Sequence, residues 1–181
     1  MPSDMNETQA DRDAVVADIT PHLIYEVQVL VQQARWLQQL QTSGPATLYT
    51  ACLEACLLHC RLLIEFLVGR PRDGAGRKRN TNDLSAVHLV PDWDEQAPTR
   101  VDIASLDLFR QRLDRALAHL SLRRLDRDDR PDSWVEEGVN LVYRSLKVFV
   151  LELDALSSSV GVGLRLALDA SEETYPLRPP E

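Results

Sequence analysis

Residues 51–66 read ACLEACLLHCRLLIEF, and this stretch decides the fold. Apolar side chains cover most of the circumference of a helix drawn through it, and only Glu54, Arg61 and Glu65 form a polar stripe, which Leu58 interrupts. A helix that is apolar on most sides is stable only when other helices surround it. We therefore predict a helical bundle whose central helix covers residues 46–68, with both of its apolar seams buried.

The same stretch contains all three cysteines of the chain and one of its four histidines. On a helix, Cys52, Cys56, His59 and Cys60 share one face, but the first and last lie about 12 Å apart along the axis. At most two of these side chains therefore reach one tetrahedral zinc ion, and the chain contains no CxxC or HExxH motif. We predict that the cysteines are small core residues, and that the protein binds no metal and no cofactor.

His59 lies within an apolar seam, between Ala55 and Leu62. A buried neutral imidazole needs at least one hydrogen-bond partner. Two interpretations follow for this residue. It is either a core histidine paired with a neighbouring side chain, or a binding residue at the centre of a polar pocket.

Three further segments carry helical periodicity, and a long irregular crossing separates the second helix from the third. We predict helices over 21–42, 46–68, 103–124 and 133–159, with Thr20 and Pro21 as the cap and first turn of the first one. Four amphipathic helices joined in this way make an all-α four-helix bundle.

The ends of the chain are assigned from composition and pattern. Residues 1–19 are expected to be a flexible segment or a short helical lead-in, residues 20–160 the bundle, and residues 161–181 a C-terminal tail. Apolar residues alternate within the tail over 161–168, a pattern that fits a short strand or the end of a helix equally well.

Overall charge and composition exclude several functional classes. The chain has 181 residues and a net charge of −8, which argues against a general nucleic-acid coat protein. No apolar run is long enough to span a bilayer, so we expect no membrane association. The polar, acidic first residues do not resemble a signal peptide, and an odd number of cysteines suits a reducing compartment. We therefore expect a cytoplasmic protein.

The order of features resembles that of a known family. A helix reading EACLLHCRLLIEFL is followed by a crossing that ends in PDW, then by a helix reading FRQRLDRALAHLSLRR and a closing helix with Trp134 near its start. This arrangement resembles the HEPN superfamily of bacterial helical bundles. Many members are toxin or phage-defence ribonucleases, others are non-catalytic, and the working unit is usually a two-fold dimer.

The family signature is an arginine followed, after four to six residues, by a histidine. Arg112 and His119 match it, with LDRALA between them, although Leu113 and Ser121 stand where catalytic members often carry polar and tyrosine side chains. The resemblance implies that His119 would take a 2′-OH proton and Arg112 would stabilise the phosphorane, without a metal ion. A basic segment between the second and third helices would then contact phosphates: Arg70, Arg72, Arg77, Lys78 and Arg79.

Two functional hypotheses from different classes follow. The favoured one is a HEPN-like binding or regulatory module of a bacterial toxin–antitoxin or defence-type system, because the chain is acidic and aromatic residues for base stacking are missing near the basic segment. The alternative is a metal-independent endoribonuclease. Expected partners are a second copy of the chain, another protein or RNA. The glutamine-rich face of the first helix, with Trp36 as an anchor, is the expected site of dimerisation.

Overall fold

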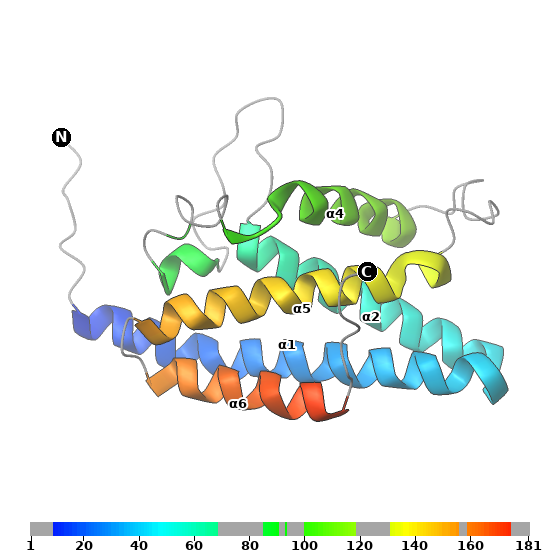
Figure 1. Cartoon of the computed structure of the whole chain (residues 1–181), viewed down its shortest axis with the longest axis horizontal. Helices are drawn as coiled ribbons and strands as arrows, with labels where there is room; N and C mark the ends of the chain where they lie inside the picture. Colours follow the sequence, from blue (N-terminus) through cyan, green and yellow to red (C-terminus); the bar gives the residue numbers. More distant parts are fainter. Residues whose placement is uncertain are drawn as a thin grey trace.

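The structure is a computed structural model that describes residues 9–68, 85–90, 93, 100–118, 131–155 and 159–174. Its elements, in chain order, are α1 (Gln9–Ser43), α2 (Ala46–Val68), the short 3₁₀ helix η1 (Ala86–His88), α4 (Ile103–Ala118), α5 (Pro131–Ala155) and α6 (Ser159–Thr174) (Figure 1). The described residues contain no strand, which confirms the all-α prediction for this part of the chain.

Helices α1 and α2 form an antiparallel hairpin along the length of the molecule (Figure 1). The turn between them is short because Gly44 donates its backbone N–H to the Leu40 carbonyl oxygen at 3.0 Å and Pro45 follows at once. A Cβ at Gly44 would overlap the Leu40 side chain, so the turn requires glycine. The predicted bounds of the second helix, 46–68, are those of α2.

The predicted start of the first helix, residue 21, is wrong, and of the two alternatives given for residues 1–19 the helical lead-in describes residues 9–19. Thr20 and Pro21 were expected to begin it, but α1 begins at Gln9 and Pro21 lies inside the helix. The buried side chains Ile19 and Leu23 lie on either side of the proline and belong to one core. Burial of this continuous apolar face offsets the free-energy cost of the backbone hydrogen bond that proline removes.

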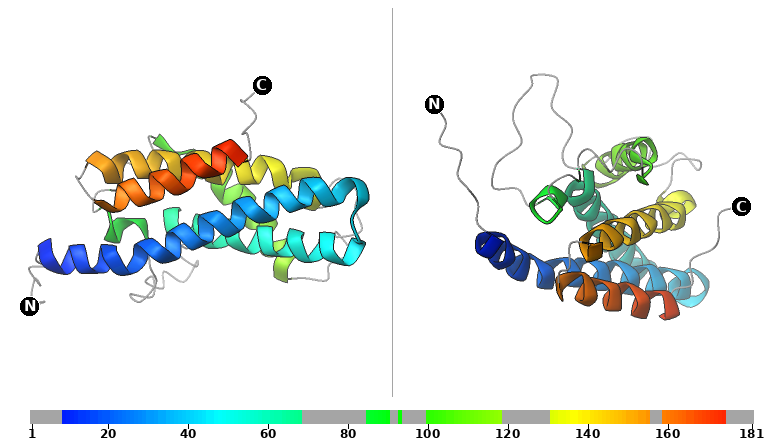
Figure 2. Two further views of the ribbon diagram at one scale, coloured as in Figure 1. Left: turned by 90° about the horizontal axis from the view of Figure 1, so that it is seen from below. Right: turned by 60° about the vertical axis from the view of Figure 1, so that its left-hand side comes forward.

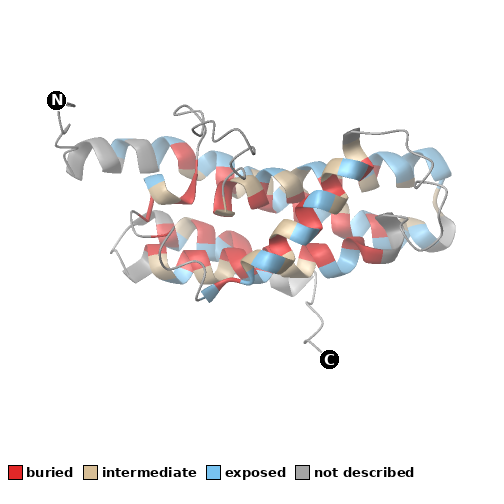
Figure 3. Cartoon of the chain, turned by 90° about the horizontal axis from the view of Figure 1, so that it is seen from above, coloured by how far each residue is buried: buried red, intermediate tan, exposed pale blue. Residues whose placement is uncertain are grey.

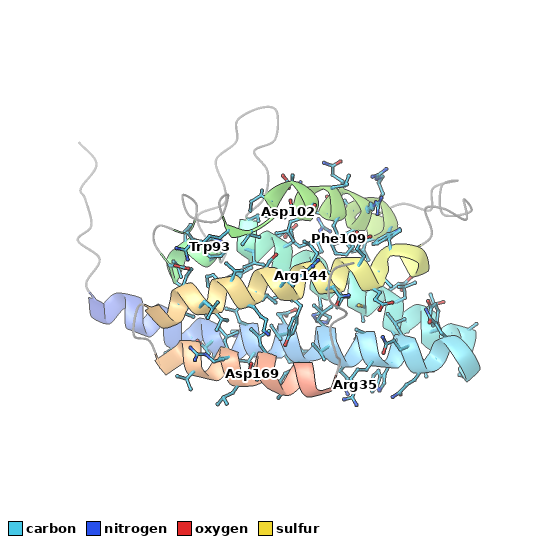
Figure 4. The ribbon with its side chains drawn as sticks, in the orientation of Figure 1. Arg35, Trp93, Asp102, Phe109, Arg144 and Asp169 are labelled. Atoms are coloured by element: carbon cyan, nitrogen blue, oxygen red, sulfur yellow. The ribbon has the colours of Figure 1, made fainter. Side chains whose placement is uncertain are left out.

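The bundle has α2 near its centre, packed against α1, α4 and α5. Buried residues lie along the inner sides of the helices and form one core (Figure 3). At the end of α2, the indole N–H of Trp93 donates a hydrogen bond to the Leu67 carbonyl oxygen at 2.6 Å. The ring of Trp93, which is labelled in Figure 4, also meets Phe149 of α5 edge-to-face, with ring centroids 5.0 Å apart. Trp93 therefore joins the crossing segment to both α2 and α5.

The segment predicted to be a C-terminal tail contains a further helix. Helix α6 packs against α1 and α5 (Figure 2). The described residues form five helices of at least four turns, and the prediction of a four-helix bundle is not confirmed. A helix places Leu164 and Leu168 on one side, and both are buried, whereas Val162 and Leu166 are exposed. The Tyr143 hydroxyl of α5 donates a hydrogen bond to the Leu168 carbonyl oxygen and fixes this helix.

The third and fourth predicted helices are present with different ends. The described part of the third ends at Ala118, and residues 119–124 of its predicted range lie outside the described residues. The predicted fourth helix, 133–159, corresponds to α5, which ends at Ala155, and the last residue of that range already belongs to α6. Helix α4 begins after Asp102, whose carboxylate accepts a hydrogen bond from the backbone N–H of Ser105 at 3.0 Å.

The cap at the start of α4 predicts a pH-dependent contribution to stability. Hydrogen bonds from the hydroxyl and the backbone N–H of Ser105 lower the pKa of Asp102. A carboxyl whose pKa is lower in the folded state stabilises the fold above its unfolded pKa, and this contribution disappears as the pH falls through its folded pKa. We expect Asp102→Ala to lower the melting temperature by a few degrees at pH 7. In thermal melts followed by circular dichroism, the difference in melting temperature between wild type and Asp102→Ala should shrink below about pH 4, near the ordinary pKa of aspartate.

Asp102→Asn is the matched control for this prediction. The amide oxygen still accepts the Ser105 hydrogen bond but does not titrate in this range, so Asp102→Asn should melt above Asp102→Ala by a margin that does not change between pH 7 and pH 3. A difference between wild type and Asp102→Ala that stays constant from pH 7 to pH 3 would contradict the proposed role of the carboxylate.

Candidate functional site

The predicted catalytic pair is described only in part. Arg112 is half-buried on α4, whereas His119 follows Ala118, the last described residue of that helix. The basic residues between positions 70 and 79 also lie outside the described residues. Leu113, at the position where catalytic family members often carry a polar group, is fully buried in the core.

A different arginine of α4 is buried, and it is one that the sequence analysis did not select. Arg110 pairs with Asp107 at 3.2 Å and with Asp114 at 3.6 Å on its own helix. Asp114 in turn lies 3.0 Å from Nε of Arg61, which also pairs with Glu65 at 3.3 Å on α2. This chain of charges connects α4 to α2. The sequence could have indicated these pairs, because Asp107 and Asp114 lie three and four residues from Arg110 and such pairs meet on one helix face.

The charge network also fixes the direction in which Arg112 points. Asp114 faces α2, and Arg112 lies two residues before it, about 200° around the helix axis. Arg112 is therefore on the side of α4 that faces away from α2. An imidazole on the same side of α4 would be needed for the pair to act together.

His59 is paired across the α1–α2 hairpin. Its Nδ1 atom lies 2.5 Å from a carboxylate oxygen of Glu26, and because a carboxylate only accepts, the imidazole donates. The Tyr25 ring meets the imidazole edge-to-face, with ring centroids 6.2 Å apart. Both partners come from α1, and no sequence pattern pointed to either of them. The pairing with Glu26 favours a histidine paired across two helices over the centre of a polar pocket.

The cysteines belong to the core, as predicted. Cys52, Cys56 and Cys60 are free and buried. Burial raises the pKa of the Cys60 thiol well above its usual value, and the neighbouring Cys56 adds to the shift. A thiol in this state is protonated at neutral pH and is a poor nucleophile. Within the ranges that the structure describes, no three His, Cys, Asp or Glu side chains come together as a metal-binding group.

One surface feature of the described residues is a set of exposed apolar side chains on the α1–α2 hairpin. It holds five of the nine large hydrophobic side chains that the described residues expose: Tyr25 (57% exposed), Trp36 (42%), Leu48 (47%), Leu58 (45%) and Leu62 (41%). Tyr25 and Trp36 are eleven residues apart, which is close to three turns, so they lie on one side of α1. Because Tyr25 contacts His59 of α2, this side borders α2. We call these five residues, with Ala51 and Ala55 between them, the α1–α2 face.

This face corrects the prediction that both seams of the second helix are buried. Leu62, which lies in the same predicted seam as His59, is exposed, and so are Leu48 and Leu58 of the same helix. Helix α2 packs against α1, α4 and α5, and these three neighbours leave one side of it uncovered in the described structure. Trp36, expected to be an exposed anchor, is exposed on the neighbouring helix.

Comparisons with known proteins return no match: no protein-family model, no curated protein and no solved structure is similar to this chain. Among the described residues, no helix combines the length and the hydrophobicity that crossing a bilayer requires. The residues of this chain and the resemblance of its sequence are therefore the basis on which a function can be proposed.

Proposed function

We propose that this chain is a HEPN-like helical bundle that binds a protein partner, works as a homodimer, and serves as a regulatory module of a bacterial toxin–antitoxin or defence-type system in the cytoplasm. The family and the biological system come from the sequence resemblance alone. The binding role is carried by one observation, the exposed α1–α2 face.

An exposed apolar face of this kind is typical of a protein–protein interface. Single exposed leucines are common on soluble proteins, but clustered apolar residues with aromatic side chains are characteristic of binding surfaces. Tryptophan and tyrosine are also the residues that most often dominate binding energy. Trp36 and Tyr25 therefore support association through this side of the hairpin.

The alternative function is a metal-independent endoribonuclease that uses Arg112 and His119. Partial exposure of Arg112 is compatible with it. The buried Leu113 speaks against it, because this position supplies no polar group to a reaction site. The non-catalytic function is therefore the favoured one.

The first experiment tests association through the α1–α2 face. We expect the purified full-length protein to have a dimer mass by light scattering at micromolar concentration. Leu58→Glu should shift it to the monomer mass, because a buried unpaired carboxylate is costly. The matched control is Leu151→Glu on α5, a leucine of higher exposure away from the face, which should leave the mass unchanged. A wild-type monomer throughout this range, or equal weakening by both substitutions, would contradict the proposal.

The second experiment separates the two functions. The wild-type protein is incubated with RNA in the presence of a chelator, and no cleavage is expected. Cleavage that persists in chelator and disappears in both Arg112→Ala and His119→Ala, with both variants folded by circular dichroism, would establish the ribonuclease instead.

A further inference from the structure

An ionisable pair lies within the α1–α2 face. Nδ1 of His59 on α2 is 2.5 Å from the Glu26 carboxylate on α1, and the Tyr25 ring of the face meets the imidazole edge-to-face. Ala55 and Leu62, which also belong to the face, lie one turn before and one turn after His59 on α2. The His59 and Glu26 side chains are 12% and 24% exposed. A partner that covers this face therefore removes water from both members of the pair.

The net charge of this pair depends on one proton. Histidine is the side chain whose charge ordinarily changes between pH 5 and 8. When the imidazole is protonated, the pair is a cation beside a carboxylate and has no net charge. When the imidazole is neutral, it still donates its Nδ1–H to Glu26, but the pair carries the full negative charge of the carboxylate. Burying the second form is the more costly, because no opposite charge repays the loss of water around the carboxylate.

We propose that association through the α1–α2 face is coupled to proton uptake at His59, so that the dimer becomes tighter as the pH falls through the range in which histidine titrates. This inference rests on the proposed binding function and adds its regulation. The sign follows from linkage, because the state that binds more protons is favoured at lower pH. The covered face favours the protonated imidazole, since only that form leaves the pair without net charge. Each copy of a two-fold dimer contributes one pair, so at most two protons are taken up.

Two further ionisable groups of α1 lie close to Glu26 along the helix. His22 is exposed one turn before Glu26, and Asp18 is exposed one turn before His22. On α2, the Cys60 thiol next to His59 stays protonated in this range, because burial raises its pKa. His22 is therefore the neighbour whose contribution to the pH dependence has to be separated from that of His59.

The charged groups on the remaining sides of α2 have contacts of their own. Arg61 lies two residues after His59, about 200° around the axis, and it pairs with Asp114 of α4. The other groups of this network are Glu65 on α2 and Asp107 and Arg110 on α4. On η1, His88 contacts the Ser85 hydroxyl at 3.0 Å. On α5, Glu152 pairs with Arg100, Lys147 lies over the Tyr143 ring, and Arg144 lowers the pKa of Asp102 after its Ser105 hydrogen bonds.

The dissociation constant of the dimer as a function of pH tests the proposal. It is measured for the full-length wild-type protein by sedimentation equilibrium at pH 6, 7 and 8 and at constant ionic strength. We expect the dissociation constant to be about tenfold lower at pH 6 than at pH 8. An average uptake of about half a proton per dimer over these two pH units produces this change.

Glu26→Gln is the sharpest comparison, because it reverses the expected sign. Beside an uncharged glutamine, neutral His59 is the form without net charge, and protonated His59 is a cation without a counter-charge. The Glu26→Gln dimer should therefore weaken as the pH falls, over the range in which the wild-type dimer tightens. His22→Gln is the matched control: it removes an exposed histidine one turn from Glu26 and should keep the wild-type pH dependence. Circular dichroism checks that both variants are folded.

A second measurement needs no variant. Dissociation of the wild-type dimer on dilution should release protons to the buffer. The heat of dilution at pH 7 should therefore differ between phosphate and Tris, two buffers with low and high ionisation enthalpies. Equal heats in the two buffers would show that no proton is coupled to association.

The outcomes distinguish failure of the coupling from failure of the proposed function. A dimer that tightens toward pH 6 in the wild type and weakens in Glu26→Gln supports the inference. A wild-type dimer with the same dissociation constant at pH 6 and pH 8, or a Glu26→Gln dimer with the wild-type dependence, overturns the coupling and leaves the binding function standing. Loss of the dependence in His22→Gln overturns the role of His59. A monomer at every pH overturns both the coupling and the proposed function.

Discussion

Replacing Trp93 by alanine is expected to lower the free energy of unfolding by about 3–5 kcal/mol, the usual cost of removing a large buried aromatic side chain. Trp93 is fully buried and meets Phe149 edge-to-face, and Phe149 in turn meets Phe66 at a centroid distance of 5.3 Å. Its indole N–H also satisfies the Leu67 carbonyl oxygen in the last turn of α2, where carbonyl groups have no partner within the helix. The substitution therefore removes packing from α5 and a hydrogen bond from α2 together.

Trp93→Phe separates the two contributions. Phenylalanine keeps an aromatic ring in the cluster but leaves the Leu67 carbonyl oxygen without its donor, which is expected to cost about 1–3 kcal/mol. Urea unfolding of both variants, followed by circular dichroism, gives the two free energies. A loss below about 1 kcal/mol for Trp93→Ala would show that the cluster does not anchor the crossing segment in the way described.

Gly138→Ala on α5 is expected to destabilise the protein by about 1–3 kcal/mol, although alanine is the better helix former. A Cβ at Gly138 would overlap the Phe109 ring of α4, which lies directly against the α5 backbone. Trp134, one turn before Gly138 on α5, meets the Phe109 ring edge-to-face, with ring centroids 5.5 Å apart. The ring has little freedom to withdraw, so the helices must separate or the aromatic pair must rearrange.

A second helical glycine provides the matched control. Gly163 of α6 has only an ordinary contact with Ile24, at 3.6 Å from the position of an added Cβ. Gly163→Ala should therefore be neutral or slightly stabilising. In a Phe109→Leu background, the cost of Gly138→Ala should fall, because the overlapping ring is gone. Equal stability of wild type and Gly138→Ala in urea would contradict the close approach of α4 and α5.

Local signals were sufficient to predict the second helix. Its bounds were correct because Gly44 and Pro45 stop one helix and start the next, and these effects act within a few residues of the chain. The burial of the cysteines was predicted from the apolar character of their helix. Each of these features depends on helix geometry or on average hydrophobicity, which the sequence contains directly.

Other features depended on which segments meet in space. Pro21 lies inside α1 because the side chains before and after it share one core, and α6 is a helix because α1 and α5 bury one side of it. The partner of His59 is Glu26, which is 33 residues away in sequence, and no local pattern connects the two. For the same reason the sequence could place Arg112 and His119 on one helix without determining what surrounds them.

That α2 is apolar on almost every side, and that other helices must pack around it, can be read from its residues alone. Which side of α2 stays uncovered depends on the packing of the whole chain. Leu48 and Leu62 are as hydrophobic as Leu63 and Leu67, so hydropathy alone does not separate the two pairs. The neighbours of α2 cover Leu63 and Leu67 and leave Leu48 and Leu62 exposed, because the number and direction of helices that pack on α2 are set by the whole chain.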